Sequence, residues 1–309
     1  MQHELLKVTA NLNSINELSK SNLMELVLRS EKNFTTQIKN MLKVFLNKGK
    51  NYKVILLSGP SSSGKTTSSK LITTGLQNEG INSLVISLDD FFVDRTKTPR
   101  LPDGAYDYES IYALDLEYFN EFLDDLLTKH SAKMPIFDFL TGARKKDLIN
   151  VEIDEHTVII FEGIHALNPI LIDNKHSSEI FRTYICLNTN FEYDDQQFIP
   201  AKDLRLMRRC LRDFFTRGHS VSATLSMWKN VLDGEEKYIK PFKDTANFVI
   251  DSTHLYEPLL YATYLMPLLE QTENNKKADS LLRMLSKCNK LEKNCIPSMS
   301  LLWEFIQKD

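Results

Sequence analysis

The stretch VILLSGPSSSGKTTSSK, residues 54–70, decides the fold of this chain. Its apolar beginning, VILLS, is typical of a short buried strand, and the residues after Gly64 favour a helix that ends near Gly80. Between them, the residues from Gly59 to Thr66 match the pattern G-x-x-x-x-G-K-[ST], in the strand–loop–helix order that this pattern requires. The stretch therefore predicts a loop that binds the phosphates of a nucleotide.

The chemistry of the loop follows from its backbone. Gly59 and Gly64 let the chain curl so that consecutive N–H groups point at phosphate oxygens, and the following helix adds its positive end. Lys65 reaches the β and γ phosphates, and Thr66 offers a hydroxyl to Mg²⁺. The residues expected to bind the nucleotide, taken as ATP with Mg²⁺, are Gly59, Ser61, Ser62, Ser63, Gly64, Lys65, Thr66 and Thr67. The alternative, a Gly/Ser-rich turn that only caps a helix, does not explain why Lys65 and Thr66 stand at the required positions.

Acidic residues follow two other apolar runs. Glu162 comes directly after VIIF and is the expected metal-associated carboxylate, because the phosphates alone leave positions open around Mg²⁺. Asp89 and Asp90 come directly after VISL, at an edge where open α/β sheets bind ligands, and one of them could accept a proton from an attacking hydroxyl. Strand termination is the alternative for Glu162, and helix capping is the alternative for one of the aspartates.

Short apolar runs alternate with helical patterns along the chain. Further strands are expected at 84–87, 158–161, 184–187 and 248–250. Further helices are expected at 116–127, where Asp115 could act as the N-cap, at 201–217 and at 256–269. This alternation predicts an α/β fold, a P-loop NTPase-type doubly wound parallel sheet flanked by helices.

Three parts are expected along the chain: a helical N-terminal extension (1–50), a P-loop domain (51–270) with an arginine-rich lid at about 200–220, and a helical C-terminal extension (271–309).

Finer features are expected within these parts. Apolar spacing between 15 and 45 predicts two helices broken around 33–35, and the polar run 47–53 is expected to be a linker. Residues 94–110 are expected to form a long surface loop.

Composition narrows the class of protein. The 309 residues carry a formal net charge of −3, so no global basic field would attract nucleic acid or an anionic membrane. The four cysteines form no C-x-x-C pair, which favours free thiols in a reducing compartment. Neither a signal peptide nor a membrane-spanning run is evident, so the sequence predicts a cytoplasmic protein.

The sequence lacks the signature motifs of several classes of P-loop protein. The chain has no D-x-x-G, no N-K-x-D and no Gly-Gly pair, which argues against a GTPase and a transport ATPase. The segment 201–217 carries arginines that could cover a transferring phosphoryl group, although a solvated basic face is the alternative. These arginines are Arg205, Arg208, Arg209, Arg212 and Arg217. The classes that remain are a small-molecule kinase and a regulatory nucleotide-binding protein.

The order of motifs resembles the uridine kinase and phosphoribulokinase family, with a helical lead-in similar to a bacterial nucleoside kinase-like subgroup. The matching segments are GPSSSGKTT, SLDDFF, GAYDYESIYALD, FDFLTGARK, VIIFEGIHAL, RLMRRCLRDFFTRG and YIKPFKDTANFVI, which span roughly residues 53–252.

The resemblance implies roles for individual residues. Asp89 matches the family's catalytic carboxylate, which orients and deprotonates a sugar hydroxyl, and Glu162 matches the Mg²⁺-associated acid. Asp107 matches the acid that binds ribose hydroxyls, with Tyr106 packing beside the nucleoside. Of the basic residues, Lys65, Arg208 and Arg212 are expected to take part in catalysis, and Arg205 and Arg217 in substrate binding.

The sequence departs from the uridine kinase pattern where the base would be recognised. Phe137 and Gly142 stand in place of the Tyr and His that read a pyrimidine edge, and Phe92 replaces a tyrosine. Phe137 is still expected to line the acceptor site. Loss of hydrogen-bonding groups affects base discrimination more than phosphate binding, so the acceptor's identity and the choice of ATP or GTP stay open.

Three functions are consistent with these features. The leading one is an ATP- and Mg²⁺-dependent kinase that phosphorylates the primary hydroxyl of a nucleoside. A same-family kinase for a phosphosugar or other hydroxylated metabolite is the second, and its acceptor phosphate would call for cations. The candidate cations are Arg95, Lys97, Arg100, Arg144, Lys145 and Lys146. A non-catalytic nucleotide-binding protein is the third. In each case the partner is a small molecule, and a homo-oligomer is compatible with the sequence.

Overall fold

The computed structural model describes residues 8–47, 52–172 and 174–308. At its centre lie five strands in the order β12-β9-β2-β8-β3, and every neighbouring pair is parallel. Their bounds are β2 (Val54–Ser58), β3 (Ser83–Ser87), β8 (Val158–Glu162), β9 (Ile180–Cys186) and β12 (Phe248–Asp251). The doubly wound parallel sheet expected from the apolar runs is therefore confirmed. Because β8 lies between β2 and β3, the carboxyl ends of these three strands meet at one edge.

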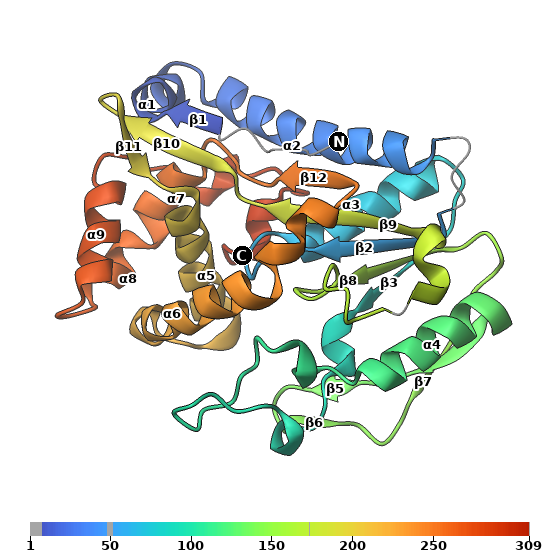
Figure 1. The fold of residues 1–309 in the computed structure, drawn as a ribbon. Helices are drawn as coiled ribbons and strands as arrows, with labels where there is room; N and C mark the ends of the chain where they lie inside the picture. Colours follow the sequence, from blue (N-terminus) through green and yellow to red (C-terminus); the bar gives the residue numbers. More distant parts are fainter. Residues whose placement is uncertain (1–7, 48–51, 173, 309) are drawn as a thin grey trace.

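Both faces of this sheet are buried. Along β2, Ile55 and Leu57 enter the larger hydrophobic cluster and Val54 and Leu56 enter the smaller one, as expected from the alternating directions of side chains on a strand. Helices α2 (Leu23–Phe45) and α3 (Lys65–Asn78) cover one face, and α4 (Leu116–Lys129) covers the other (Figure 1). Asp115 caps α4 by accepting a hydrogen bond from the Tyr118 amide at 3.1 Å, which confirms the expected N-cap.

The N-terminal helices divide at a different place than expected. A short strand, β1 (Val8–Asn11), leads into α1 (Leu12–Ser21), and α2 then continues unbroken to Phe45. The break predicted around 33–35 is wrong, because Phe34 is buried in the core and holds that turn of α2 in place. The chain breaks instead at Asn22, whose side chain accepts from the Glu25 amide at 3.2 Å and caps the second helix. Most of the expected linker, residues 48–51, lies outside the described residues.

A second, three-stranded sheet has the order β1-β10-β11, with β10 (Thr189–Tyr193) and β11 (Gln196–Ile199). It leads into the arginine-dense helix α5 (Ala201–Arg217) and then α6 (Val221–Tyr238).

The predicted helix 256–269 is two helices, α7 (Glu257–Tyr264) and α8 (Met266–Glu270). Pro267 near the start of α8 has no N–H to continue the helical hydrogen bonds of α7. The chain then forms α9 (Lys276–Leu285) and two 3-10 turns, η6 (Lys293–Cys295) and η7 (Leu301–Glu304).

The segment between β3 and β8 carries short elements. Two antiparallel pairs, β4 (Ser131–Met134) with β7 (Ile149–Glu152) and β5 (Phe137–Asp138) with β6 (Ala143–Arg144), lie beside α4. The expected loop 94–110 contains a short 3-10 turn, η2 (Arg95–Lys97), and one antiparallel bridge between Arg100 and Tyr106. The remaining 3-10 turns are η1 (Leu88–Phe91), η3 (Ile111–Ala113), η4 (Asn174–Glu179) and η5 (Lys240–Thr245).

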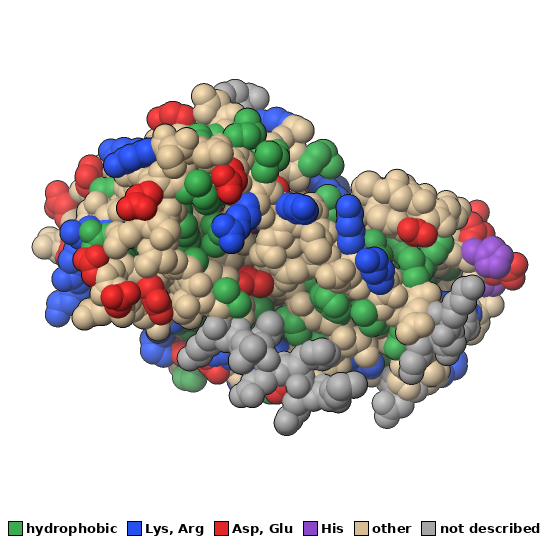
Figure 2. Space-filling view, turned by 90° about the horizontal axis from the view of Figure 1, so that it is seen from above, with side chains coloured by type: hydrophobic (Ala, Val, Ile, Leu, Met, Phe, Trp, Pro, Cys, Tyr) green, Lys and Arg blue, Asp and Glu red, His purple; other side chains and the backbone are tan. Residues whose placement is uncertain are grey.

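Charges of both signs lie on one face of the molecule. Figure 2 looks onto the face above α2 and shows lysine and arginine side chains interspersed with aspartate and glutamate. Among the described residues, no helix combines the length and the apolar character that crossing a membrane requires.

Candidate active site

The glycines of the predicted loop are required by close packing. A Cβ at Gly59 would lie 2.1 Å from the Ile185 carbonyl oxygen, and one at Gly64 would lie 2.3 Å from Leu301 Cδ1. Gly64 also has a φ of +91°, which L side chains rarely adopt, at the N-cap position just before α3. The hydroxyls of Ser62 and Ser63 are buried and have no hydrogen-bond partner among the described residues. Such orphaned polar atoms in a glycine-bracketed loop fit a bound anion.

Lys65 lies near the acidic side chains of the site. Its Nζ donates to the carbonyl oxygens of Gly59 at 2.9 Å and Pro60 at 3.2 Å. Burial lowers the pKa of Lys65, and the nearby carboxylates of Glu162, Glu304 and Asp89 oppose that change in pKa. The ammonium is therefore held on the loop backbone, with three carboxylates close enough to influence it.

The sheet brings Glu162 and Asp89 together. Glu162 is the last residue of β8 and pairs in register with Ser87, the last residue of β3, and Asp89 follows two residues later. Burial raises the pKa of Glu162 to about 7, Lys65 opposes this, and Asp89 and Glu304 add to it. A carboxylate with so high a pKa needs a cation beside it to stay ionised at neutral pH.

Asp89 and Asp90 point to different surroundings. Desolvation by the surrounding protein raises the pKa of Asp89, and this rise is opposed most strongly by Lys65 and then by Arg217. Water still reaches the Asp89 side chain. Asp90 instead accepts a hydrogen bond from the Phe137 amide at 3.4 Å, which ties η1 to β5. Asp89 is therefore the member of the pair that faces the loop.

Three arginines of α5 contact Ser61 of the loop. Arg209 Nη1 donates to Ser61 Oγ at 2.9 Å and Arg212 Nη2 to the same atom at 3.3 Å, and Arg205 Nη1 donates to the Ser61 carbonyl at 3.2 Å. Arg205 also pairs with Glu235 and lies over the Trp228 ring at 4.8 Å. The solvated basic face considered for this helix is therefore wrong for these three side chains, which are largely buried.

Asp213, fully buried, holds the lid arginines together. It lies 3.3 Å from Arg209, 3.0 Å from Arg212 and 3.2 Å from Arg217, whose side chain remains half exposed. The shared carboxylate offsets the repulsion among three cations beside the loop.

Arg208 does not reach the loop. It is fully buried, and its guanidinium pairs with Glu257 at 2.7 Å and donates to the Ser252 carbonyl at 2.8 Å. Because its side chain points into the core between α5 and α7, the catalytic role expected for Arg208 does not fit its position.

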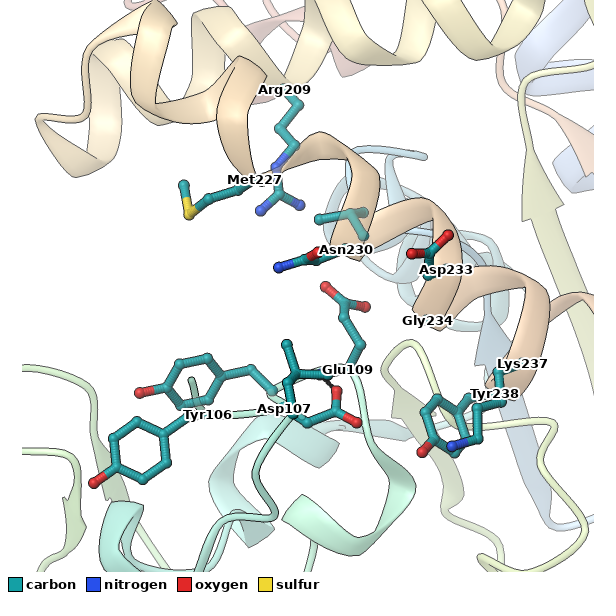
Figure 3. A pocket seen from close by; sticks show the side chains of 13 residues that line it. Tyr106, Asp107, Glu109, Arg209, Met227, Asn230, Asp233, Gly234, Lys237 and Tyr238 are labelled. Atoms are coloured by element: carbon teal, nitrogen blue, oxygen red, sulfur yellow. Dashed lines mark hydrogen bonds between the residues drawn. The ribbon is translucent and has the colours of Figure 1, made fainter. Parts of the chain in front are cut away.

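A cavity of about 260 Å³ lies between the 106–109 segment and α6 (Figure 3). Asp107 and Tyr106, both expected to contact the acceptor, line it, and so does Arg209. Glu109 points from the loop toward α6, where Gly234 leaves room for it: a Cβ at Gly234 would lie 2.4 Å from Glu109 Cβ. Burial raises the pKa of Glu109, with Arg209 and then Arg205 opposing this rise.

Phe137 is not among the residues that line this cavity. Its ring packs against Phe92 and Phe139, with centroids 5.6 and 5.1 Å away. Beside it, a Cβ at Gly142 would lie 2.5 Å from the Arg95 guanidinium. An arginine therefore fills the space next to the position where the resemblance expects a histidine.

Sequence reasoning missed three acidic residues of this region: Glu109, Asp213 and Glu304. Glu109 stands two residues after Asp107, and this closeness to an expected acceptor-binding residue could have identified it. Asp213 lies four residues after Arg209 and four before Arg217, a spacing at which charges on a helix pair. Glu304 had no local signal, since it lies at the far end of the chain.

The oxygen atoms available in the site suit a hard cation that a nucleotide also helps to bind. Thr66 and Glu162 offer oxygen ligands, which Mg²⁺ prefers. Within residues 8–47, 52–172 and 174–308, no group of three or more His, Cys, Asp or Glu side chains could hold a metal by itself. A Mg²⁺ ion here would thus take part of its coordination from phosphate oxygens and water.

Comparisons with known proteins point to one family. A model of the "Phosphoribulokinase / Uridine kinase family" matches residues 54–256. The chain is 28% identical over 203 residues to a uridine kinase of Bacillus subtilis, covering 65% of this chain and 87% of that one. It is 29% identical over 195 residues to a uridine kinase of Halobacterium salinarum, covering 63% and 77%.

Among solved structures, "a Possible Uridine Kinase from Bacillus stearothermophilus" aligns with a TM-score of 0.47 and 21% identity over 70% of this chain and 98% of that one. The family match begins at β2 and includes the loop, both strand-end carboxylates, the cavity and α5. The chain therefore belongs to the phosphoribulokinase / uridine kinase family.

Proposed function

We propose that this protein is a kinase that transfers the γ-phosphoryl group of ATP, with Mg²⁺, to the primary hydroxyl of a nucleoside. The observation that carries the proposal is the grouping of Lys65, Asp89 and Glu162, whose charges influence one another beside a loop with two orphaned serine hydroxyls. Family membership supports a phosphotransferase, and the cavity beside the loop offers room for the acceptor.

The loop and its lysine would bind the phosphates. Amides of the first turn of α3 and the unpartnered hydroxyls of Ser62 and Ser63 would donate to phosphate oxygens, and Lys65 would exchange its carbonyl partners for phosphate oxygens. Thr66 and Glu162 would hold Mg²⁺, which when bound neutralises charge on the β and γ phosphates.

Asp89 would orient the acceptor hydroxyl and take its proton. Its raised pKa suits a proton acceptor better than that of an ordinary surface aspartate. In the transfer, the acceptor oxygen forms a bond to the γ-phosphorus and the bond from that phosphorus to the bridging oxygen of ADP breaks. The hydroxyl proton passes to Asp89. Because the transition state is loose, positioning and charge stabilisation dominate over proton abstraction.

Arg209 and Arg212 would stabilise the moving phosphoryl group. Both donate to Ser61 Oγ, a neutral partner within the loop, and a phosphoryl oxygen is a stronger acceptor for the same guanidinium groups. Asp213 keeps both side chains directed to the loop. We therefore assign the role suggested by the helix pattern to Arg209 and Arg212, and not to Arg208.

The charges of the cavity favour an unphosphorylated acceptor. Three carboxylates line it, from Asp107, Glu109 and Asp233, against the two cations of Arg209 and Lys237. The cations considered for a phosphosugar acceptor do not line it, and several have structural partners. Arg144 binds Asp115 at 2.9 Å, and Arg100 lies over Tyr106 at 4.2 Å. An acceptor rich in hydroxyl or N–H donors fits these carboxylates better than a phosphate does.

The test is ADP release measured with purified protein, Mg²⁺·ATP and a panel of nucleosides, phosphosugars and small hydroxylated acids. A nucleoside is expected to give the highest kcat/KM, with phosphate on its 5′ oxygen in the product. Turnover with a phosphosugar alone would contradict the acceptor class. Nucleotide binding without turnover of any acceptor would instead support a non-catalytic nucleotide-binding protein.

A further inference from the structure

The C-terminal turn η7 lies on the nucleotide-binding loop. Glu304 Oε2 accepts hydrogen bonds from the Thr67 amide at 3.2 Å and from Thr67 Oγ1 at 3.0 Å. Leu301 is fully buried and lies against Gly64, so that no Cβ would fit there. A segment more than 200 residues away in sequence thus contacts the first turn of α3 at two points.

The residues around Glu304 hold it in this position. Ser300 Oγ lies 3.4 Å from the hydroxyl of Tyr256, and Phe305, also buried, packs under the Arg208 guanidinium at 4.8 Å. The Trp303 indole donates to the Pro297 carbonyl at 2.8 Å. The turn is therefore part of the packed structure and presents its one acidic side chain to the loop.

Glu304 occupies donors that a phosphate would use. The first amides of a helix have no partner within the helix, and in a loop of this type they bind phosphate oxygens. The Thr67 amide is one of these, and here a carboxylate satisfies it together with the neighbouring hydroxyl. Glu304 is also close enough to act electrostatically on Lys65 and on Glu162. An incoming nucleotide therefore meets a competing anion already bound to the loop.

We propose that Glu304 sets the affinity for nucleotide by competing with phosphate for Thr67, and that its carboxylate leaves Thr67 when nucleotide binds while η7 stays packed. The inference rests on the proposed function, because it requires a nucleotide phosphate in this loop. It gives the C-terminal segment, which lies outside the family match, a role in the reaction.

The test compares the affinity for Mg²⁺·ADP of the wild-type protein, Glu304→Gln and Glu292→Gln by isothermal titration calorimetry. Glutamine keeps the size and an acceptor oxygen of Glu304 but removes the charge, so Glu304→Gln is expected to bind about tenfold more tightly. Glu292, exposed in the same segment, accepts from the Tyr264 hydroxyl at 2.9 Å away from the loop, and its variant is expected to bind like wild type. Equal or weaker binding by Glu304→Gln overturns the inference.

A second measurement follows the turn itself. Trp303 stands next to Glu304, so its fluorescence, obtained by subtracting a Trp303→Phe variant, is expected to change as Mg²⁺·ADP saturates the wild-type protein. An unchanged signal at saturation overturns the departure of the Glu304 carboxylate from Thr67. If wild type binds Mg²⁺·ADP and Glu304→Gln binds no better, only the inference fails. If neither binds it, the proposed function fails as well.

Discussion

Arg208 and Glu257 are joined by two hydrogen bonds in a place that water does not reach: Nε donates to Oε2 at 2.7 Å and Nη2 to Oε1 at 2.9 Å. Tyr261 donates to the same carboxylate at 2.8 Å. The pair connects α5 to α7 from inside the core. An arginine in the middle of an arginine-rich helix thus serves the fold, while its neighbours serve the loop.

Replacing Arg208 by alanine should destabilise the protein strongly. Glu257 would stay buried without its cation, which costs about 3–5 kcal/mol in the free energy of unfolding. Urea unfolding measures this, with the half-exposed Arg217→Ala as the control, expected to change stability by at most about 0.5 kcal/mol. If Arg208→Ala does not fold, the double variant Arg208→Met, Glu257→Leu should fold, because it removes both charges. An Arg208→Ala protein as stable as wild type would contradict this account of the pair.

Replacing Arg212 by alanine should lower activity strongly and change stability little, the opposite of the effect of Arg208→Ala on stability. The Arg212 guanidinium contacts Ser61 of the loop, so its loss is expected to lower kcat about a hundredfold or more by removing a donor to the moving phosphoryl group. Stability should change little, because Asp213 keeps Arg209 and Arg217 as partners. The measurements are kcat with the best acceptor of the panel and urea unfolding. Unchanged kcat would remove Arg212 from the mechanism.

The sequence could not have separated the two arginines. Arg208 stands three residues after Arg205 and four before Arg212, so helical spacing places it on the same side of the helix as these two. In the structure Arg205, Arg209 and Arg212 contact Ser61, whereas Arg208 lies in the core. Charge density predicted a lid, and tertiary packing decides which side chains belong to it.

Local patterns predicted the loop and the sheet well. The strand, both glycines, Lys65 and the α3 helix lie within one continuous stretch, so their geometry is encoded in neighbouring residues. The position of Glu162 beside Asp89 also followed, because apolar runs that end in acids meet at one edge of a parallel sheet. Glu304 could not be placed this way, because its contact with Thr67 depends on how the chain's last turn packs in three dimensions.

Asp89→Asn should abolish most catalysis and leave nucleotide binding intact. Asparagine keeps the size of the side chain but cannot accept the hydroxyl proton, so kcat is expected to decrease at least about a hundredfold. The affinity for Mg²⁺·ADP should be equal to or slightly better than wild type, because one negative charge near the phosphates is removed. Asp90→Asn is the matched control, and since Asp90 binds the Phe137 amide, its kcat should change much less. Similar kcat values for the two variants would exclude Asp89 as the proton acceptor.

Buried His165 should make stability depend on pH. Burial, with Lys65 nearby, lowers the pKa of His165 to about 4, whereas a histidine in the unfolded chain titrates near 6.5. Between these values the unfolded state binds a proton that the folded state does not, so stability is full above pH 6.5 and is lost as the pH falls. Between pH 7.5 and 5.0, wild type should lose about 2 kcal/mol more than His165→Leu.

Urea unfolding at both pH values measures this difference for His165. His156→Gln serves as the control, because that side chain is exposed and the variant should keep the pH dependence of wild type. Equal pH dependence in wild type and His165→Leu would show that His165 does not carry the effect.

Asp107→Asn should act on acceptor binding more than on catalysis. Asp107 lines the cavity, where an ionised carboxylate accepts hydrogen bonds from two ribose hydroxyls more strongly than an amide does, so KM for the acceptor is expected to rise about tenfold or more. KM for ATP should stay the same. Asp103→Asn offers a close control, because both aspartates accept from the amide two residues on, at 3.2 Å for Asp107 and 3.0 Å for Asp103. Only Asp107 lines the cavity, so a rise in acceptor KM in both variants would point to the loop's shape rather than to a contact with the acceptor.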